Sequence, residues 1–245
     1  MRKKKMIEVK EPKVVFSVTE RFKFIDQFVN LVGSGKLNSF ILTGSGGLGK
    51  THAVIEGLKR KGLKEDTVME DGDFIFIRGY STAKALYRTL WEQNGKVIIF
   101  DDADSVHKDP IGANILKAAL GSEEKRVISW GAEFPESESL PNRFEFRGRV
   151  VFISNLSQAQ FPQALLSRSM KVDLTLNTAE KLERIREVFK EIKGDVDEKA
   201  DVLEFIDQYA DIASDLNIRS CLNILKLKRD IGDDWKRLAL YNFVS

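Results

Sequence analysis

Short runs of apolar residues alternate with longer segments of helical periodicity over the first 176 residues of the chain. Most of these runs are apolar at nearly every position, which is typical of strands that are covered on both faces. They lie at 38–44, 73–79, 96–102, 149–155 and 170–176. Helical patterns lie between several of them, at 51–61, 82–93 and 110–120. Strand–helix–strand alternation predicts an α/β fold in which a parallel sheet is sandwiched between helices.

The pattern changes after residue 176. Over 177–245 apolar residues recur at helical spacing, as at Leu182 and Ile185, and no run resembles a strand. We therefore expect an α/β domain over 19–176, followed by a small all-helical domain over 177–245. The preceding residues, 1–18, are expected to form a basic arm, because the stretch MRKKKMIEVKEPK holds six basic and two acidic residues.

One segment of the α/β domain departs from this alternation. The stretches KRVISW and RFEFRG alternate apolar and polar positions on either side of an acidic sequence, as the two strands of a hairpin do. We predict a hairpin insertion over about 125–148 with an acidic tip and a basic base. The acidic residues of the tip are Glu133, Glu136 and Glu138, and the basic residues toward the base are Lys125, Arg126, Arg143, Arg147 and Arg149.

The first apolar run leads directly into GSGGLGKT, which fits the pattern G-x-x-x-x-G-K-[S/T] in full. Glycine-rich backbone in this setting wraps around phosphate groups with its N–H groups pointing inward, and the following helix adds its positive end. The lysine supplies a cation to the β- and γ-phosphates, and the threonine hydroxyl is a ligand for Mg²⁺. We expect ATP and Mg²⁺ to bind at Gly44, Ser45, Gly46, Gly47, Leu48, Gly49, Lys50, Thr51 and His52.

Acidic and amide side chains end two further strands. The run VIIFDD ends in Asp101, which we expect to bind Mg²⁺ with Thr51, and in Asp102, which we expect to activate the attacking water. The run VVFISN ends in Asn155, whose amide is placed to orient that water. Asp104 either assists Asp102 or caps the next helix, and capping is the simpler interpretation.

These motifs, together with QALLSRS and with NIRS in the helical segment, resemble those of the AAA+ ATPases over about residues 20–230. The resemblance implies a P-loop αβα core followed by a helical lid. It implies that Asn155 is sensor 1 and that Arg219 is sensor 2, which contacts the γ-phosphate from the lid. It also implies that Arg168 is an arginine finger, which reaches the nucleotide of a neighbouring subunit. Asp102 departs from the usual glutamate of the family and is one methylene shorter, so either the site is tighter, hydrolysis is slow, or Asp104 assists.

A finger donated in trans requires a homo-oligomer, and the resemblance implies a ring or spiral, with a hexamer as the expected form. Arg143 and Arg147 are alternatives to Arg168 for this role. A finer similarity, carried by FDDADS, NILKAAL and RFEFRGRVVFISN, is to phage-encoded members with a hairpin before sensor 1. It implies that the protein works in the cytoplasm of a host cell.

Three interpretations of the work driven by hydrolysis stay open. The basic arm, the basic hairpin base and the SRS motif indicate remodelling or translocation of nucleic acid, as in replication or recombination. Tyr80 follows the second strand, where the resemblance places a pore-facing aromatic residue, and it indicates a protein remodeller that grips polypeptide. Asp102 favours a slow, ATP-switched assembly scaffold or loader. DNA and a partner protein that supplies specificity are therefore both candidate partners.

Composition narrows the partners and the compartment. The 245 residues include 39 Lys and Arg against 37 Asp and Glu, so the net charge is +2 and contact with nucleic acid must come from local patches. The single cysteine, Cys221, excludes an intrachain disulfide and fits a reducing compartment. No apolar stretch reaches the roughly 18–20 residues of a membrane span, and no apolar segment of a secretory signal follows the basic N-terminus. We expect a cytoplasmic protein without a membrane partner.

Overall fold

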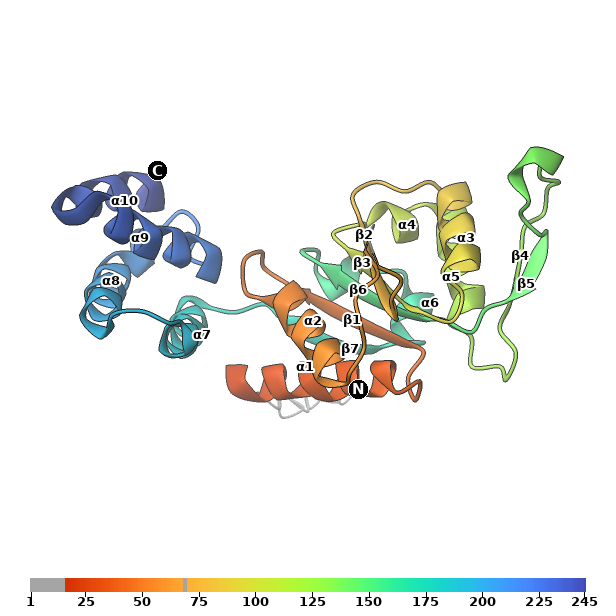
Figure 1. Cartoon of the computed structure of the whole chain (residues 1–245), viewed down its shortest axis with the longest axis horizontal. Coiled ribbons are helices and arrows are strands. Elements are labelled where there is room, and N and C mark those ends of the chain that lie inside the picture. Colours follow the sequence, from red (N-terminus) through yellow and green to blue (C-terminus); the bar gives the residue numbers. More distant parts are fainter. Residues whose placement is uncertain (1–15, 68–69) are drawn as a thin grey trace, which may run out of the picture.

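The computed structural model describes residues 16–67 and 70–245. Nearly all of the predicted basic arm lies outside these described residues. Figure 1 shows a central sheet with helices on both faces, a group of helices at one end (blue) and a β-hairpin at the opposite end (green). The site described below lies between the sheet and the helical group.

Five strands form one sheet in the order β2-β3-β6-β1-β7, and every neighbouring pair is parallel. The strands are β1 (Ser39–Gly44), β2 (Phe74–Arg78), β3 (Val97–Asp101), β6 (Arg149–Ser154) and β7 (Met170–Leu174). All five predicted strands are confirmed, with ends close to those expected. Because the strands are parallel, the residues that follow β1, β3 and β6 meet at the same edge of the sheet.

Helices cover both faces of this sheet, as the apolar strands require. Successive residues of a strand point to opposite faces: Ile41 packs in one core with α3 and α5, and Phe40 packs in the other with α1 and α2. The helices of this part are α1 (Val18–Gly33), α2 (Lys50–Arg60), α3 (Ala83–Glu92), α4 (Ser105–Lys108), α5 (Pro110–Ala119) and α6 (Gln163–Leu166). The predicted αβα sandwich is confirmed.

Helix α1 was not among the predicted elements, although its sequence carries a start signal. The Ser17 hydroxyl accepts a hydrogen bond from the Glu20 N–H at 3.2 Å, and the Glu20 carboxylate accepts one from the Ser17 N–H at 2.8 Å. This reciprocal capping box is the S-x-x-E pattern that begins many helices. The helix therefore starts at Val18, the last residue of the predicted arm.

The C-terminal part consists of four α-helices with a core of their own (Figure 1). They are α7 (Thr178–Glu191), α8 (Val196–Tyr209), α9 (Ile218–Ile231) and α10 (Trp235–Val244). The expected helical part after the sheet is thus confirmed, and we call α7–α10 the helical region. Cys221 is fully buried in its core, and this burial raises the pKa of the thiol to about 12, so the group is inert at neutral pH.

The predicted hairpin is confirmed by the antiparallel strands β4 (Val127–Ser129) and β5 (Arg143–Glu145). One acidic residue of its tip pairs with basic residues of the same chain. The Glu138 carboxylate accepts hydrogen bonds from Lys84 Nζ at 2.6 Å and from Arg88 Nη2 at 2.8 Å, both on α3. These ion pairs, which hold the pKa of Glu138 below its usual value, tie the tip to the core of the same chain.

The basic residues toward the base of the hairpin fall into two groups. Arg126 donates to the carbonyl oxygens of Ala119 and Gly148 at 2.8 and 2.9 Å, and Arg149 donates to that of Gly95 at 2.9 Å. These hydrogen bonds engage both arginines within the fold, and burial lowers the pKa of both guanidinium groups. The exposed basic residues are Lys125, Arg143 and Arg147.

Candidate functional site

The glycine-rich loop joins β1 to α2 and is built on left-handed backbone. Gly47 and Gly49 have φ angles of +70° and +84°, which few residues other than glycine adopt. A Cβ atom on Gly47 would also lie 2.4 Å from Asn217 Oδ1, so a side chain has no room there. Gly49 is the N-cap of α2, so the unpaired N–H groups of that helix begin at the loop and favour an anion.

Lys50, the first residue of α2, is 5% exposed. Its ammonium group donates to the carbonyl oxygens of Gly44 and Ser45 and to Asn155 Oδ1, each at 2.8 Å. Burial lowers its pKa, and the nearby charges of Asp102 and Asp101 act in the opposite direction. The cation is therefore held beside the loop by neutral oxygens, where a phosphate oxygen is a stronger acceptor.

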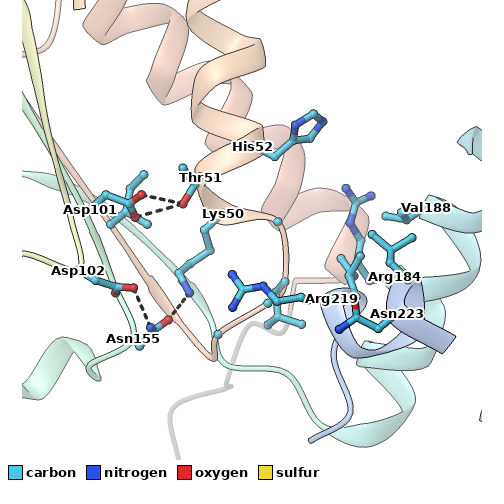
Figure 2. Close-up of a pocket in the computed structure, with 17 residues that line it drawn as sticks. Lys50, Thr51, His52, Asp101, Asp102, Asn155, Arg184, Val188, Arg219 and Asn223 are labelled. Atoms are coloured by element: carbon cyan, nitrogen blue, oxygen red, sulfur yellow. Dashed lines mark hydrogen bonds between the residues drawn. The ribbon is translucent and has the colours of Figure 1, made fainter. Parts of the chain in front are cut away.

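Thr51 and Asp101 meet at the start of α2 and the end of β3 (Figure 2). The Thr51 hydroxyl lies 3.1 and 3.3 Å from the two oxygens of the Asp101 carboxylate. Arg78 Nε, at the end of the neighbouring strand β2, donates to Asp101 Oδ2 at 3.2 Å. A hydroxyl and one carboxylate suit Mg²⁺, which usually takes few protein ligands and completes its shell with water and phosphate oxygens. Within the described residues, no cluster of three His, Cys, Asp or Glu residues offers a separate metal site.

Asp102 and Asn155 face one another across the ends of β3 and β6 (Figure 2). Asn155 Nδ2 donates to Asp102 Oδ2 at 3.1 Å. Asp102 has a φ of 53°, a left-handed conformation that aspartate tolerates better than glutamate and most other residues. Desolvation raises the pKa of its carboxyl, and the charge of Asp101 adds to the shift. A carboxylate with a raised pKa is better suited to accept a proton near neutral pH.

The helical region closes the opposite side of the cavity. Asn217 caps α9, because its side-chain oxygen accepts a hydrogen bond from the Ser220 N–H at 2.9 Å. The backbone N–H of Ile218, the residue after Asn217, donates to the Gly47 carbonyl at 3.0 Å. This contact brings Arg219, on the first turn of α9, to the cavity (Figure 2). The positive charge of Arg219 acts on Lys50 and contributes to its lowered pKa.

Together these elements enclose a cavity of about 560 Å³, which we call the loop pocket. Its volume falls within the range of roughly 300–1,000 Å³ typical of small-molecule sites. The predicted residues that line it are Gly46, Gly47, Leu48, Gly49, Lys50, Thr51, His52, Asp101, Asp102, Asn155 and Arg219. Gly44 and Ser45 do not line it and instead hold Lys50 through their carbonyl oxygens.

Arg168 is the predicted site residue that lies away from this cavity. It is exposed between α6 and β7, and its Nη1 donates to the Ala164 carbonyl at 2.9 Å. The loop pocket follows the end of β1, whereas Arg168 precedes the start of β7, and these two strands are parallel neighbours. Arg168 therefore lies at the opposite edge of the sheet from the loop pocket of its own chain.

Several lining residues of the helical region were not predicted. They are Arg184, Val188, Ile218, Leu222 and Asn223. Arg184 lies over the Phe22 ring of α1 at 3.9 Å and pairs with Glu187 at 2.9 Å. The spacing of apolar residues in the sequence of α7 predicts an amphipathic helix. That spacing does not distinguish a residue that faces a cavity from one that faces the core.

Comparison with known sequences finds a phage relative. No family model matches the sequence. The chain is 30% identical over 179 residues to the uncharacterized 36.7 kDa protein in the nrdC-mobD intergenic region of Enterobacteria phage T4; the match covers 67% of this chain and 53% of the phage protein. The chain thus spans about half the length of this relative.

A solved structure matches nearly the whole chain. Domain III of the Thermotoga maritima replication initiation protein DnaA superposes with a TM-score of 0.50 at 14% sequence identity, over 95% of this chain and 94% of that domain. The two share an α/β core followed by helices, which is the arrangement that the sequence predicted. In the part of the chain that the structure describes, no helix is long and apolar enough to cross a membrane.

Proposed function

We propose that this protein is an AAA+ ATPase that binds ATP with Mg²⁺ in the loop pocket and hydrolyses it. The observation that carries the proposal is the meeting of four elements in one cavity. These are the glycine loop with Lys50, the Thr51–Asp101 pair, the Asp102–Asn155 pair, and Arg219 from the helical region. Each element offers the chemistry that one part of a bound triphosphate requires.

The residues then take the following parts. The loop N–H groups and Lys50 bind the β- and γ-phosphates, while Arg219 contacts the γ-phosphate from the other side. Thr51 and Asp101 hold Mg²⁺, which when bound neutralises charge on the phosphates. Asp102 accepts a proton from the attacking water, and Asn155, hydrogen-bonded to Asp102, orients that water.

Turnover of ATP by the purified protein tests this proposal. We expect ATP hydrolysis that requires Mg²⁺ and stops when EDTA removes it, because the negative carboxylate of Asp101 would repel the triphosphate if no cation lay between them. Asp101→Asn, which keeps the shape but removes the charge, is expected to raise the Mg²⁺ concentration needed for half-maximal turnover. Hydrolysis that continues unchanged in EDTA would contradict the assignment of Thr51 and Asp101.

For the work that hydrolysis drives, we propose remodelling or translocation of nucleic acid by a homo-oligomeric ring or spiral, most simply a hexamer. The shared fold with domain III of a replication initiation protein supports this role. The exposed basic residues of the hairpin, Lys125, Arg143 and Arg147, offer phosphate contacts, and Arg147 also pairs with Glu145 at 3.2 Å. Arg126 and Arg149 are instead engaged within the fold. The phage relative supports a phage origin and a site of action in the host cytoplasm.

Tyr80 favours a second candidate, a protein remodeller. Its side chain is 83% exposed on the loop after β2, and Ser81 of that loop donates its N–H to Ser105 Oγ of α4 at 3.0 Å. An exposed aromatic ring on a loop anchored beside Asp104 is suited to grip a polypeptide. A partner protein that supplies specificity belongs to either candidate.

Stimulation of ATP turnover by two polymers separates the candidates. For the nucleic-acid role we expect oligo(dT) to stimulate ATP turnover, and this stimulation should fall as the salt concentration rises. Most of the stimulation should be lost in the triple variant Lys125→Ala, Arg143→Ala, Arg147→Ala. Stimulation by casein that Tyr80→Ala abolishes would instead support the protein remodeller. Tyr241→Ala is the matched control, because Tyr241 is 77% exposed on α10. Turnover below about one per minute that neither polymer changes, against the usual ~1–10³ s⁻¹ of enzymes, would support the slow scaffold.

A further inference from the structure

Three polar side chains adjoin the Asp102–Asn155 pair along the chain, and two of them are buried. Ser154, at the end of β6, and His107, on α4, are 1% and 2% exposed. Asp104 lies between them: its Oδ1 accepts a hydrogen bond from the Ser154 hydroxyl at 2.7 Å and lies 3.3 Å from His107 Nε2. The expectation that Asp104 caps the following helix is wrong, because its side chain makes no capping hydrogen bond.

The Ser154 hydroxyl has two roles at once. It donates to Asp104 and accepts from the Leu156 N–H at 3.0 Å, so it bridges the residues on either side of Asn155. The conformation of this turn fixes where the Asn155 amide points, with its oxygen on Lys50 and its nitrogen on Asp102. A shift in the turn would therefore move a group that contacts two parts of the loop pocket.

We propose that Asp104 is a positioning residue, which holds the Asn155 amide in the loop pocket through the hydroxyl of Ser154. This inference rests on the proposed ATPase function. A hydrogen bond to a carboxylate is shorter and stronger than one between neutral groups, so it restricts the turn more tightly than a backbone oxygen would. Asp104 itself is not among the residues that line the cavity, so it acts on the reaction through Asn155.

His107 contacts the same carboxylate oxygen of Asp104 as Ser154 does. Its ring stacks on Phe161 with centroids 4.1 Å apart and meets the Phe152 ring edge-on. Burial lowers the pKa of His107, so the ring is neutral at pH 7, and with its proton on Nε2 it donates to Asp104. Among the described residues, Nδ1 has no hydrogen-bond partner, so the bond to Asp104 and the packing of the ring are what keep the imidazole in place.

The test compares Asp104→Ala in two backgrounds. In the parent background we expect kcat for ATP to fall roughly 10- to 100-fold, the range that a misplaced catalytic group produces, with KM nearly unchanged. Asp104→Asn keeps an oxygen acceptor for Ser154 and is expected to recover most of this loss. In the Asn155→Ala background, Asp104→Ala should cause no further fall in kcat, because the group that it positions is already absent. Lys108→Ala, at an exposed position of the same short helix, is the matched control and should keep the kcat of the parent.

Two results would overturn the inference. One is a kcat of Asp104→Ala equal to that of the parent. The other is an equal fold-loss in both backgrounds, which would show a general effect on the fold. Thermal unfolding of every variant is measured alongside, and Ser154→Ala, which removes the same link by deleting one oxygen, replaces Asp104→Ala if that variant does not fold. Absence of ATP turnover in the parent itself would refute the proposed function, and is thus distinct from these results.

Discussion

Replacement of Lys50 by alanine is expected to reduce ATP hydrolysis by roughly 100- to 1,000-fold, the usual loss when one donor to developing charge is removed. Lys50 is the buried cation of the loop pocket, and its ammonium reaches the oxygens of the loop and of Asn155. We also expect weaker binding of MgATP, because charge-assisted hydrogen bonds to phosphate contribute about 1.5–3 kcal/mol each. Steady-state hydrolysis and titration calorimetry measure the two effects.

Lys59→Ala is the matched control, since Lys59 is exposed in the last turn of the same helix. It should keep the turnover and the affinity of the parent. Lys50→Ala leaves the Gly44 and Ser45 carbonyls without this donor, so its thermal unfolding must be measured to show that the variant is folded. If a folded Lys50→Ala variant bound MgATP as tightly as the parent, this result would contradict the proposal that the triphosphate binds in the loop pocket.

The sequence predicted the sheet well because its strands are covered on both faces. A run such as VIIFDD is apolar at four successive positions and then turns acidic, so both the strand and its exposed end are visible in one stretch. The glycine loop was equally clear, because few backbones other than glycine adopt the conformations of Gly47 and Gly49. Parallel neighbours then bring Asp101 and Asn155 to the edge where that loop begins.

What the sequence did not show depends on contacts between distant segments. The capping pattern at Ser17 and Glu20 was present, but the start of α1 directly follows the basic stretch and was assigned to the arm. Glu138 was predicted only as part of an acidic tip, and the structure places it against Lys84 and Arg88, about fifty residues earlier in the chain. No local pattern specifies which charged groups such a hairpin meets when it folds back.

The same limit explains Asp104. An aspartate before a short helix is most often a cap, and the sequence around it fits that interpretation. Its actual partner, Ser154, lies fifty positions away and reaches it only because β3 and β6 are neighbours in the sheet. The conformation of Asp102 is a further example: its positive φ explains why aspartate stands where the resemblance expects glutamate, and nothing in the sequence alone indicates this backbone.

Replacement of Arg168 by alanine is expected to slow hydrolysis by roughly 10³-fold or more while ATP still binds, as for arginine fingers supplied in trans. Arg168 is exposed at the edge of the sheet opposite the loop pocket of its own chain, so we expect any contribution to hydrolysis to be made in the pocket of another copy. Arg186→Ala, an exposed arginine of α7, is the matched control and should keep the turnover of the parent. Arg147→Ala tests the alternative finger on the hairpin, and a loss confined to that variant would move the role there.

Mixing two inactive variants separates action in trans from a structural effect. Lys50→Ala subunits have a pocket that hardly hydrolyses ATP but retain Arg168, whereas Arg168→Ala subunits have an intact pocket but lack the finger. At each head-to-tail interface of an equal mixture, the pocket comes from an Arg168→Ala subunit with probability one half, and the neighbouring finger comes from a Lys50→Ala subunit with probability one half. About a quarter of the interfaces therefore have both parts intact, so turnover should recover to about a quarter of that of the parent. A mixture no faster than its separate components would contradict completion of the pocket by a neighbour, since each half of the site is present in the solution and only their meeting at an interface restores hydrolysis.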